Sequence, residues 1–269
     1  MAQQEMSFWS HLDVLRSALI KILAVTMLFT VVAFCFKERL FAVILAPQDP
    51  GFFIYHWLDR LSAPFSGGAS SSFHIRLINT ALAGQFLTHI KASFCAGILC
   101  ASPYILYQLF RFVSPALYAD ERKYSLRVVG GGYLMFMVGV VVAYFLIFPL
   151  TFRFLGTYQV DAEVENLISL KSYISTFFTM LLSMGAVFEI PVLCWLFAKL
   201  GFLSASFMKK YRRHAIVLIL IVAAVITPTS DVITLTAVSL PMWLLYEFSI
   251  LLVRQTRKTH KASSGVLPD

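Results

Sequence analysis

The chain alternates between long apolar runs and short polar segments along most of its length. Runs of about 20 apolar residues can cross a hydrocarbon core of about 30 Å as helices, which satisfy all their backbone groups internally. The alternating ten-residue pattern of an outer-membrane barrel is not found. The pattern therefore predicts an all-α polytopic membrane protein with six transmembrane helices, at residues 15–36, 86–112, 128–148, 173–200, 215–226 and 232–253.

The last two predicted spans are short, the fifth most clearly. Its apolar part, residues 215–226, would be about 18 Å long at about 1.5 Å per residue, well below the thickness of the hydrocarbon core. We expect the bilayer to thin locally or neighbouring protein to cover the helix ends. A tilted-in polar terminus with a snorkelling Arg213 is the alternative.

Composition agrees with the membrane assignment. Apolar residues make up 59% of the 269, charged residues 13%, and the mean hydropathy is +0.78. A soluble domain is nearer half apolar and a quarter charged. Residues 1–254 are interpreted as a single six-span membrane domain, and 255–269 as a flexible cytoplasmic tail.

The positive charges give an orientation. Of the 22 Lys and Arg residues, 15 fall on the side of the two termini and seven on the other side. Because cytoplasmic loops carry the excess of Lys and Arg, both termini are predicted to be inside. The N-terminus resembles neither a cleavable signal peptide nor a transit peptide, which favours a bacterial cytoplasmic (inner) membrane.

The net charge of +8 does not indicate nucleic-acid binding. The basic residues stand at the ends of apolar runs, and no basic segment has the length or interleaved aromatics of a nucleic-acid site. They are interpreted as topology signals and contacts to lipid headgroups.

Sequence motifs for enzymatic chemistry were not found. There is no H-E-x-x-H, G-x-S-x-G, P-loop or G-x-G-x-x-G sequence. The four cysteines lack metal-ligand spacing, and no histidine lies centrally in a span. We therefore predict a protein that is not an enzyme and has no cofactor and no metal site.

Two carboxylates within predicted spans are candidate functional residues. Glu189 lies deep in the fourth span, where a carboxylate is costly and normally faces protein or water. Pro191 removes a backbone donor there, which predicts a kink beside the acid. Glu189 either bonds a neighbouring helix of the same chain or contacts a substrate or partner helix. Glu247 follows the same logic nearer the inner end of the sixth span.

The polar loop from Phe112 to Lys123 separates the second and third spans. It contains Pro115 and the charged run Asp120, Glu121, Arg122 and Lys123. Its acids could simply complement the dipole at the start of the third helix. An exposed carboxylate such as Glu121 can also receive an arginine bidentately. The loop is interpreted as a cytoplasmic docking surface for another polypeptide.

Five motifs in this order resemble the TatC family, the multispanning subunit of the twin-arginine (Sec-independent) protein translocase. They are the loop F-x-x-P-x-L-Y-x-x-E-R-K at 112–123, P-x-I-L-Y-Q at 103–108, F-E-x-P at 188–191, T-P-x-x-D at 227–231 and P-M-x-L-x-Y-E at 241–247. The resemblance extends from about His11 to Arg254.

The resemblance implies a receptor for signal peptides that carry two adjacent arginines on folded cargo, with export driven by the protonmotive force. It implies single-span TatA/TatB-type partners, other copies of this chain and membrane lipid as its surroundings. The implied signal-peptide residues are Glu121, Asp13, Arg16, Phe112, Pro115, Arg122 and Lys123. Glu189, Pro191 and Glu247 would be intramembrane polar contacts, and Pro228 and Asp231 would fix an outer turn.

One departure from the family pattern concerns the N-terminal segment. The family's H-L-x-E-L-R sequence is His11-Leu12-Asp13-Val14-Leu15-Arg16 here, so Val14 occupies the position of the acid. Asp13 is adjacent, but neighbouring helical residues point about 100° apart.

A proton-coupled secondary transporter that uses Glu189 is the alternative function, although no inverted repeat is evident. A structural membrane scaffold is a third possibility.

Overall fold

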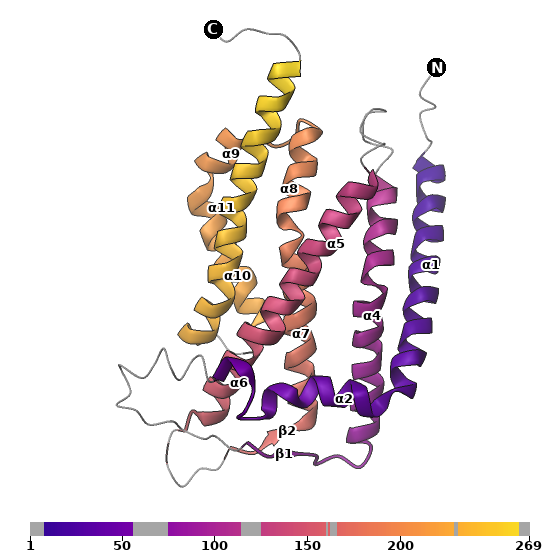
Figure 1. The fold of residues 1–269 in the computed structure, drawn as a ribbon, viewed down its shortest axis with the longest axis vertical. Coiled ribbons are helices and arrows are strands. Elements are labelled where there is room, and N and C mark those ends of the chain that lie inside the picture. Colours follow the sequence, from indigo (N-terminus) through magenta and orange to yellow (C-terminus); the bar gives the residue numbers. More distant parts are fainter. Residues whose placement is uncertain are drawn as a thin grey trace. The chain divides into compact units, whose positions relative to one another are not determined.

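The structure, a computed structural model of the chain, describes residues 8–55, 75–113, 125–159, 161, 166–228 and 231–263 (Figure 1). Most of them are helical. The long helices are α1 (Phe8–Cys35), α4 (Gly84–Val113), α5 (Ser125–Val142), α7 (Leu170–Phe188), α8 (Ile190–Lys199), α10 (Arg212–Ile226) and α11 (Val232–Ser263).

Five helical stretches are long and apolar enough to cross a membrane. They are Leu12–Cys35, Gly84–Phe112, Val129–Thr157, Leu170–Lys199 and Val232–Gln255. The sixth helix of the predicted topology is α10, which has only 15 residues. The all-α six-span architecture is therefore confirmed. The short fifth span is confirmed too, whereas the apolar stretch of the sixth is 24 residues long and is not short.

Several predicted boundaries are wrong. The third span does not end at Phe148, because a π-helical turn η4 (Ala143–Ile147) leads from α5 into α6 (Phe148–Thr157), which has Pro149 in its first turn. A proline is tolerated there because its missing N–H needs no partner in that turn. The first span, in contrast, ends at Cys35, next to its predicted end at Phe36, and the charged residues after it begin a new helix, α2 (Lys37–Leu45). Helix α11 continues through Ser263, well into the segment predicted as a tail.

Short elements connect the long helices. The 3₁₀-helix η1 (Ala46–Gln48) follows α2, and α9 (Ala205–Lys210) lies between α8 and α10. The strands β1 (Leu77–Ile78) and β2 (Ile168–Ser169) form a parallel pair, with Leu77 opposite Ile168 and Ile78 opposite Ser169. This pairing joins two connecting segments that are far apart in sequence.

The chain divides into two compact units. Unit 1 lies within Met1–Lys37 and His89–Leu134, and unit 2 within Glu38–Thr88 and Met135–Asp269. In unit 1, α1 and α4 lie side by side (Figure 1). A Cβ added to Gly97 of α4 would lie 2.8 Å from the backbone N of Thr30 and 3.0 Å from the carbonyl O of Thr26 in α1. The small residue thus allows the close approach of the two helices.

In unit 2, α5 and α7 cross where each helix presents a glycine to the other. A Cβ on Gly139 would lie 2.6 Å from the carbonyl oxygen of Met184 and 2.8 Å from the ring of Phe188. Conversely, the ring of Phe136 lies over Gly185, 2.7 Å from where its Cβ would be. Two aromatic side chains therefore fill the space that the two glycines leave open.

Three tyrosine hydroxyls in unit 2 hold the end of α2. Tyr144 donates to the carbonyl of Val43 at 2.9 Å, Tyr173 donates to that of Ile44 at 2.8 Å, and Tyr55 donates to that of Pro47 at 2.6 Å. The last carbonyls of a helix have no partner within it, so the bonds from Tyr144 and Tyr173 satisfy the C-terminus of α2, and the bond from Tyr55 holds the following η1. Burial raises the pKa of Tyr55, against the opposing effect of Arg153, so its hydroxyl remains a donor.

The crossing of α5 and α7 predicts that Gly139→Ala destabilises the protein. Because the new Cβ meets backbone, the helices must separate, at a cost of about 1–3 kcal/mol in the free energy of unfolding. The matched control is Gly131→Ala in the same helix, which has nothing within 4 Å of the new methyl group. Thermal unfolding in detergent measures both variants, and equal melting temperatures would contradict the close approach.

Candidate functional site

Glu189 lies at the junction between α7 and α8, about ten residues, or roughly 15 Å, from the end of α8 at Lys199. The residue is only 7% exposed. Both of its carboxylate oxygens are buried and accept no hydrogen bond from the residues that the structure describes. A carboxyl group in this condition is costly unless something outside the described residues contacts it.

The break predicted near Pro191 falls at Glu189 itself. The N–H of Glu189 donates to the carbonyl of Ala186 at 3.2 Å, a tighter turn than in an α-helix. The regular pattern then resumes, with the N–H of Leu193 donating to the Glu189 carbonyl at 3.0 Å. The tight turn thus places the acid at the only residue between two helices in the fourth apolar stretch.

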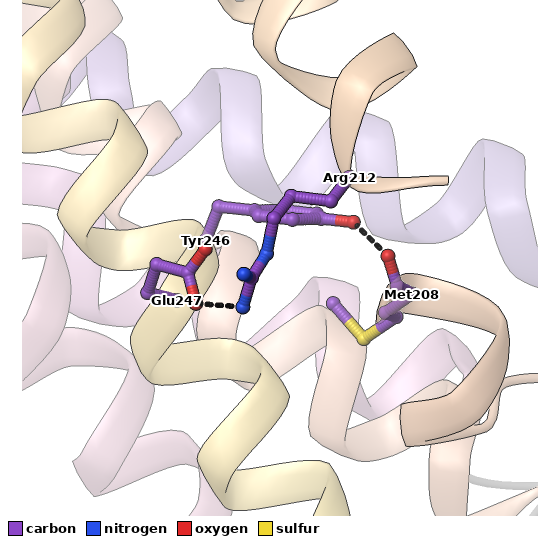
Figure 2. Close-up of polar contacts among 4 residues, drawn as sticks. All are labelled: Met208, Arg212, Tyr246 and Glu247. Atoms are coloured by element: carbon purple, nitrogen blue, oxygen red, sulfur yellow. Dashed lines mark hydrogen bonds and ion pairs between the residues drawn. The ribbon is translucent and has the colours of Figure 1, made fainter. Parts of the chain in front are cut away.

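Glu247 has a partner in the same chain (Figure 2). The Arg212 side chain, from the first residue of α10, donates through Nη2 to Oε2 of Glu247 on α11 at 2.7 Å. Beside it, the Tyr246 hydroxyl donates to the Met208 carbonyl at 2.8 Å. These two bonds tie α9 and α10 to α11. Oε1 of Glu247 is buried and accepts no hydrogen bond from the described residues.

At the opposite end of α10, Asp231 forms the N-cap of α11. Its Oδ1 accepts from the N–H of Thr234 at 2.8 Å, and its Oδ2 accepts from the Thr234 hydroxyl. The preceding helix ends at Thr227, whose hydroxyl donates to the Ala223 carbonyl at 3.0 Å. Pro228 is exposed in the connection. Asp231 thus stabilises the start of the last helix in the way expected of an N-cap acid.

The predicted signal-peptide residues belong to unit 1 as far as they are described. Asp13 and Arg16 are exposed on α1, and Phe112 is half-buried near the end of α4. Pro115, Glu121, Arg122 and Lys123 lie outside the described residues.

The pairing of α1 with α4 determines which of their ends meet. Gly97 lies against Thr26 and Thr30, and His89 stacks on Phe34 with ring centroids 4.1 Å apart. The residue numbers run in opposite directions, so the helices are antiparallel. Asp13 precedes Thr26 by 13 residues, and Arg16 precedes Thr30 by 14. Phe112 follows Gly97 by 15 residues. At about 1.5 Å per residue, all three lie roughly 20 Å from the contact, at the same end of unit 1.

Comparison with known proteins decides the family. The family model described as "Sec-independent protein translocase protein (TatC)" matches residues 10–241. This chain belongs to the TatC family.

Relatives of similar length support this assignment. The TatC protein of Blattabacterium sp. subsp. Periplaneta americana is 32% identical over 253 residues, which cover 92% of this chain and 95% of the relative. That of Desulforapulum autotrophicum is 34% identical over 249 residues, with coverages of 93% and 84%. Among solved structures, a crystal structure titled as the twin-arginine translocase receptor TatC superposes with a TM-score of 0.72 at 29% identity. It covers 91% of this chain and 98% of the solved chain.

Membership in the TatC family makes this chain a multi-pass membrane component of a Sec-independent protein translocase. The family is a non-enzymatic receptor family whose members belong to a complex with partner subunits. Within the described residues, no three His, Cys, Asp or Glu side chains gather in a way that could hold a metal ion.

A shallow groove between α10 and α11 has no charged lining. Its walls are formed by Ile216, Ile219, Leu220, Thr236, Ser239, Leu240 and Trp243. The two hydroxyls in this set are bonded to carbonyls of their own helix, Thr236 to Val232 at 2.6 Å and Ser239 to Thr236 at 3.4 Å. The groove therefore suits an apolar segment rather than a polar solute.

Sequence reasoning missed Arg212 as the partner of Glu247. It counted the cation as one of several charges on the inner side. The available signal was the position of Glu247 near the inner end of its span, where a cation of the preceding basic loop comes within reach. The tyrosine bonds to α2 carry no comparable signal, because Val43 and Tyr144 are 101 residues apart.

The ion pair predicts unequal effects of its two single substitutions. Arg212→Gln leaves a half-buried carboxylate without its cation, whereas Glu247→Gln leaves an arginine whose side chain is 46% exposed to solvent. Arg212→Gln should therefore lower the melting temperature more than Glu247→Gln does. The double variant should recover part of the loss.

A double-mutant cycle of thermal unfolding in detergent measures the coupling between the two side chains. We expect about 1 kcal/mol or less, because the pair is partly exposed. Additive effects of the two substitutions would show that the pair does not hold α10 to α11.

Proposed function

We propose that this chain is the receptor subunit that binds twin-arginine signal peptides of folded cargo at the cytoplasmic face of a bacterial inner membrane. Glu121 receives the arginine pair, and Phe112, Pro115, Arg122 and Lys123 shape the surrounding loop. Asp13 and Arg16 of α1 complete the site. Single-span subunits of the TatA/TatB type and further copies of this chain assemble with it, and the protonmotive force drives export.

One observation carries this proposal. The antiparallel pairing of α1 with α4 brings Asp13 and Arg16 to the end of unit 1 at which α4 reaches Phe112 and the predicted docking loop begins. Two segments about 100 residues apart in sequence can therefore contact one short peptide. The excess of Lys and Arg on the side of the termini supports a cytoplasmic location for this end.

The electrostatics of the site suit an arginine pair. Two carboxylates, at positions 13 and 121, match two guanidinium groups, each of which can bind a carboxylate through two parallel hydrogen bonds. Lysine cannot reproduce this geometry with its single ammonium group. The site should therefore distinguish Arg-Arg from Lys-Lys in a peptide of the same charge.

Glu189 is proposed as the polar contact for a single-span partner helix. Its two oxygens accept no hydrogen bond from the described residues, although the residue is 93% buried. A hydroxyl or amide group on a partner helix could donate to this carboxyl and would remove the cost of leaving it unbonded. Glu247 is the lesser candidate, since Arg212 already occupies one of its oxygens.

The docking loop predicts a difference between two neighbouring acids. Glu121→Gln should weaken the binding of a twin-arginine signal peptide about tenfold or more, because a charge-assisted bidentate contact is lost. Asp120→Asn removes the same charge from the same loop and should have little effect. Fluorescence titration with a labelled twin-arginine peptide measures both affinities, and photocrosslinking from position 121 tests separately whether the peptide lies at the loop.

Two results would contradict this assignment of the arginine site. The first is equal weakening by both loop substitutions, which would indicate net charge alone. The second is a crosslink from position 121 that persists unchanged when the arginine pair of the peptide becomes Lys-Lys. Asp13→Asn should lower the affinity as well, and no change would leave Asp13 outside the site.

The proposed partner contact predicts two outcomes for Glu189→Ala. Recovery of a co-purified single-span subunit should fall severalfold. The isolated chain should keep its melting temperature, since removing an unbonded buried carboxyl costs little. Glu247→Gln is the comparison variant and should lower partner recovery less than Glu189→Ala does, because Arg212 already occupies one of the Glu247 oxygens. Normal recovery with Glu189→Ala would refute the contact, and a destabilised isolated chain would show that Glu189 bonds within this chain instead.

A further inference from the structure

The segment that forms α8, α9 and α10 is rich in cations and contains no acid of its own. From Ile190 to Ser230 the sequence has no Asp or Glu but has Lys199, Lys209, Lys210, Arg212 and Arg213. Arg212 is neutralised by Glu247, and Lys199 lies over the Trp195 ring at 4.7 Å. Lys209, Lys210 and Arg213 are exposed, and no carboxylate of the described residues forms an ion pair with them. These three residues are called the basic corner.

The basic corner is held firmly against the last helix. Met208 is buried in a cluster with Ile250 and Val253 of α11, and Leu203 packs on the same cluster. The Tyr246 hydroxyl also bonds the Met208 carbonyl (Figure 2). The three cations therefore project from a fixed turn, which is the condition for a defined binding site.

Exposed aromatic side chains surround the corner. Phe202 is 81% exposed and Phe207 53% exposed. The Phe207 ring lies 4.6 Å from that of Tyr211, and the Lys210 ammonium lies 5.9 Å from the centre of the Tyr211 ring. Aromatic rings beside lysine and arginine are typical of the headgroup layer, where the rings are half in lipid. The surroundings thus favour a membrane surface over bulk water.

The length of α10 places the corner deep in that layer. Its 15 residues span about 22 Å, against a hydrocarbon core of about 30 Å. If the outer end of α10 reaches its interface, the first turn at Arg212 and Arg213 lies several ångströms below the usual headgroup level. Arg212 has its counter-ion within the chain, whereas Lys209, Lys210 and Arg213 form no ion pair with the part of the chain that the structure describes.

We propose that the basic corner binds the phosphate of an anionic phospholipid and draws its headgroup down to the short helix α10. The acyl chains lie along the apolar side of α10, where Val217, Leu218 and Ile221 are more than half exposed. Charge complementarity, the aromatic surroundings and the helix length all favour a lipid over an acidic peptide. This proposal does not rest on signal-peptide recognition.

Native mass spectrometry of the full chain in detergent tests the proposal, with phosphatidylglycerol and phosphatidylcholine as probes. The wild type should retain phosphatidylglycerol in preference to phosphatidylcholine. The variant Lys209→Gln/Lys210→Gln/Arg213→Gln should bind it about tenfold more weakly or worse. The matched control Lys37→Gln/Arg39→Gln/Lys171→Gln removes the same charge from exposed positions elsewhere and should retain the lipid. Lys209→Arg/Lys210→Arg keeps the charge and should retain it too.

Several outcomes would overturn the proposal. They are equal retention of the two lipids by the wild type, unchanged binding by the Gln variant, or an equal loss in the matched control. Full displacement of the lipid by millimolar inorganic phosphate would indicate a site for free phosphate. If the wild type binds an acidic peptide and the Gln variant loses that peptide while its lipid binding stays intact, the basic corner is a site for a protein partner.

A salt titration of the wild type tests the site independently of any substitution. Because the headgroup contacts are ionic and lie near the surface, raising sodium chloride from about 0.1 M to about 1 M should release phosphatidylglycerol from the basic corner. Retention at the higher concentration would contradict the proposal even if the Gln variant fails to fold.

Discussion

A polar group inside a hydrocarbon layer has no water to bond, so the protein must supply its partner. Most polar groups in the described membrane helices obey this constraint locally. Thr30 donates to the Thr26 carbonyl at 2.8 Å, and Ser249 donates to that of Leu245 at 2.7 Å. Helix ends are satisfied by side chains, locally by Asp231 at the start of α11 and over about 100 residues of sequence by tyrosine hydroxyls at the end of α2. Helix α2 is therefore stabilised by hydrogen bonds from tyrosines of α7 and η4, because a helix of nine residues is too short to be stable by itself.

The two intramembrane acids differ in how they meet this constraint. Glu247 has Arg212 at 2.7 Å from within the chain, and the pair couples α10 to α11. Glu189 has nothing comparable among the described residues, although it is the more deeply buried of the two. The free energy of an unbonded buried carboxyl favours a hydrogen-bond partner from outside the described residues. Because its partner Arg212 lies within the chain, Glu247 primarily stabilises the packing of α10 against α11.

The sequence pattern predicts the long helices well because lipid sets their length and apolar composition directly. It fails where the outcome depends on distant partners. Pro149 is a sound stop signal on local grounds, yet the π-helical turn at Ala143–Ile147 lets the helix continue through it. The Lys37–Arg39 cluster ends one apolar run and also begins α2, whose position depends on tyrosines about 100 residues further along. For the candidate site, the motifs predict Glu189 and Asp13, but only the antiparallel contact at Gly97 relates Asp13 to Phe112.

The short helix α10 links these observations to the membrane. A helix of about 22 Å cannot keep both ends at the interfaces of an undisturbed bilayer. Tilting would shorten its reach further, so the mismatch has to be met by the lipid or by neighbouring helices. The inner end is fixed to α11 by Arg212 and by the packing of Met208, which prevents α10 from sliding to relieve the mismatch. The cations of the basic corner form no ion pair with the described residues, and attraction between them and anionic headgroups would lower the cost of thinning the bilayer there.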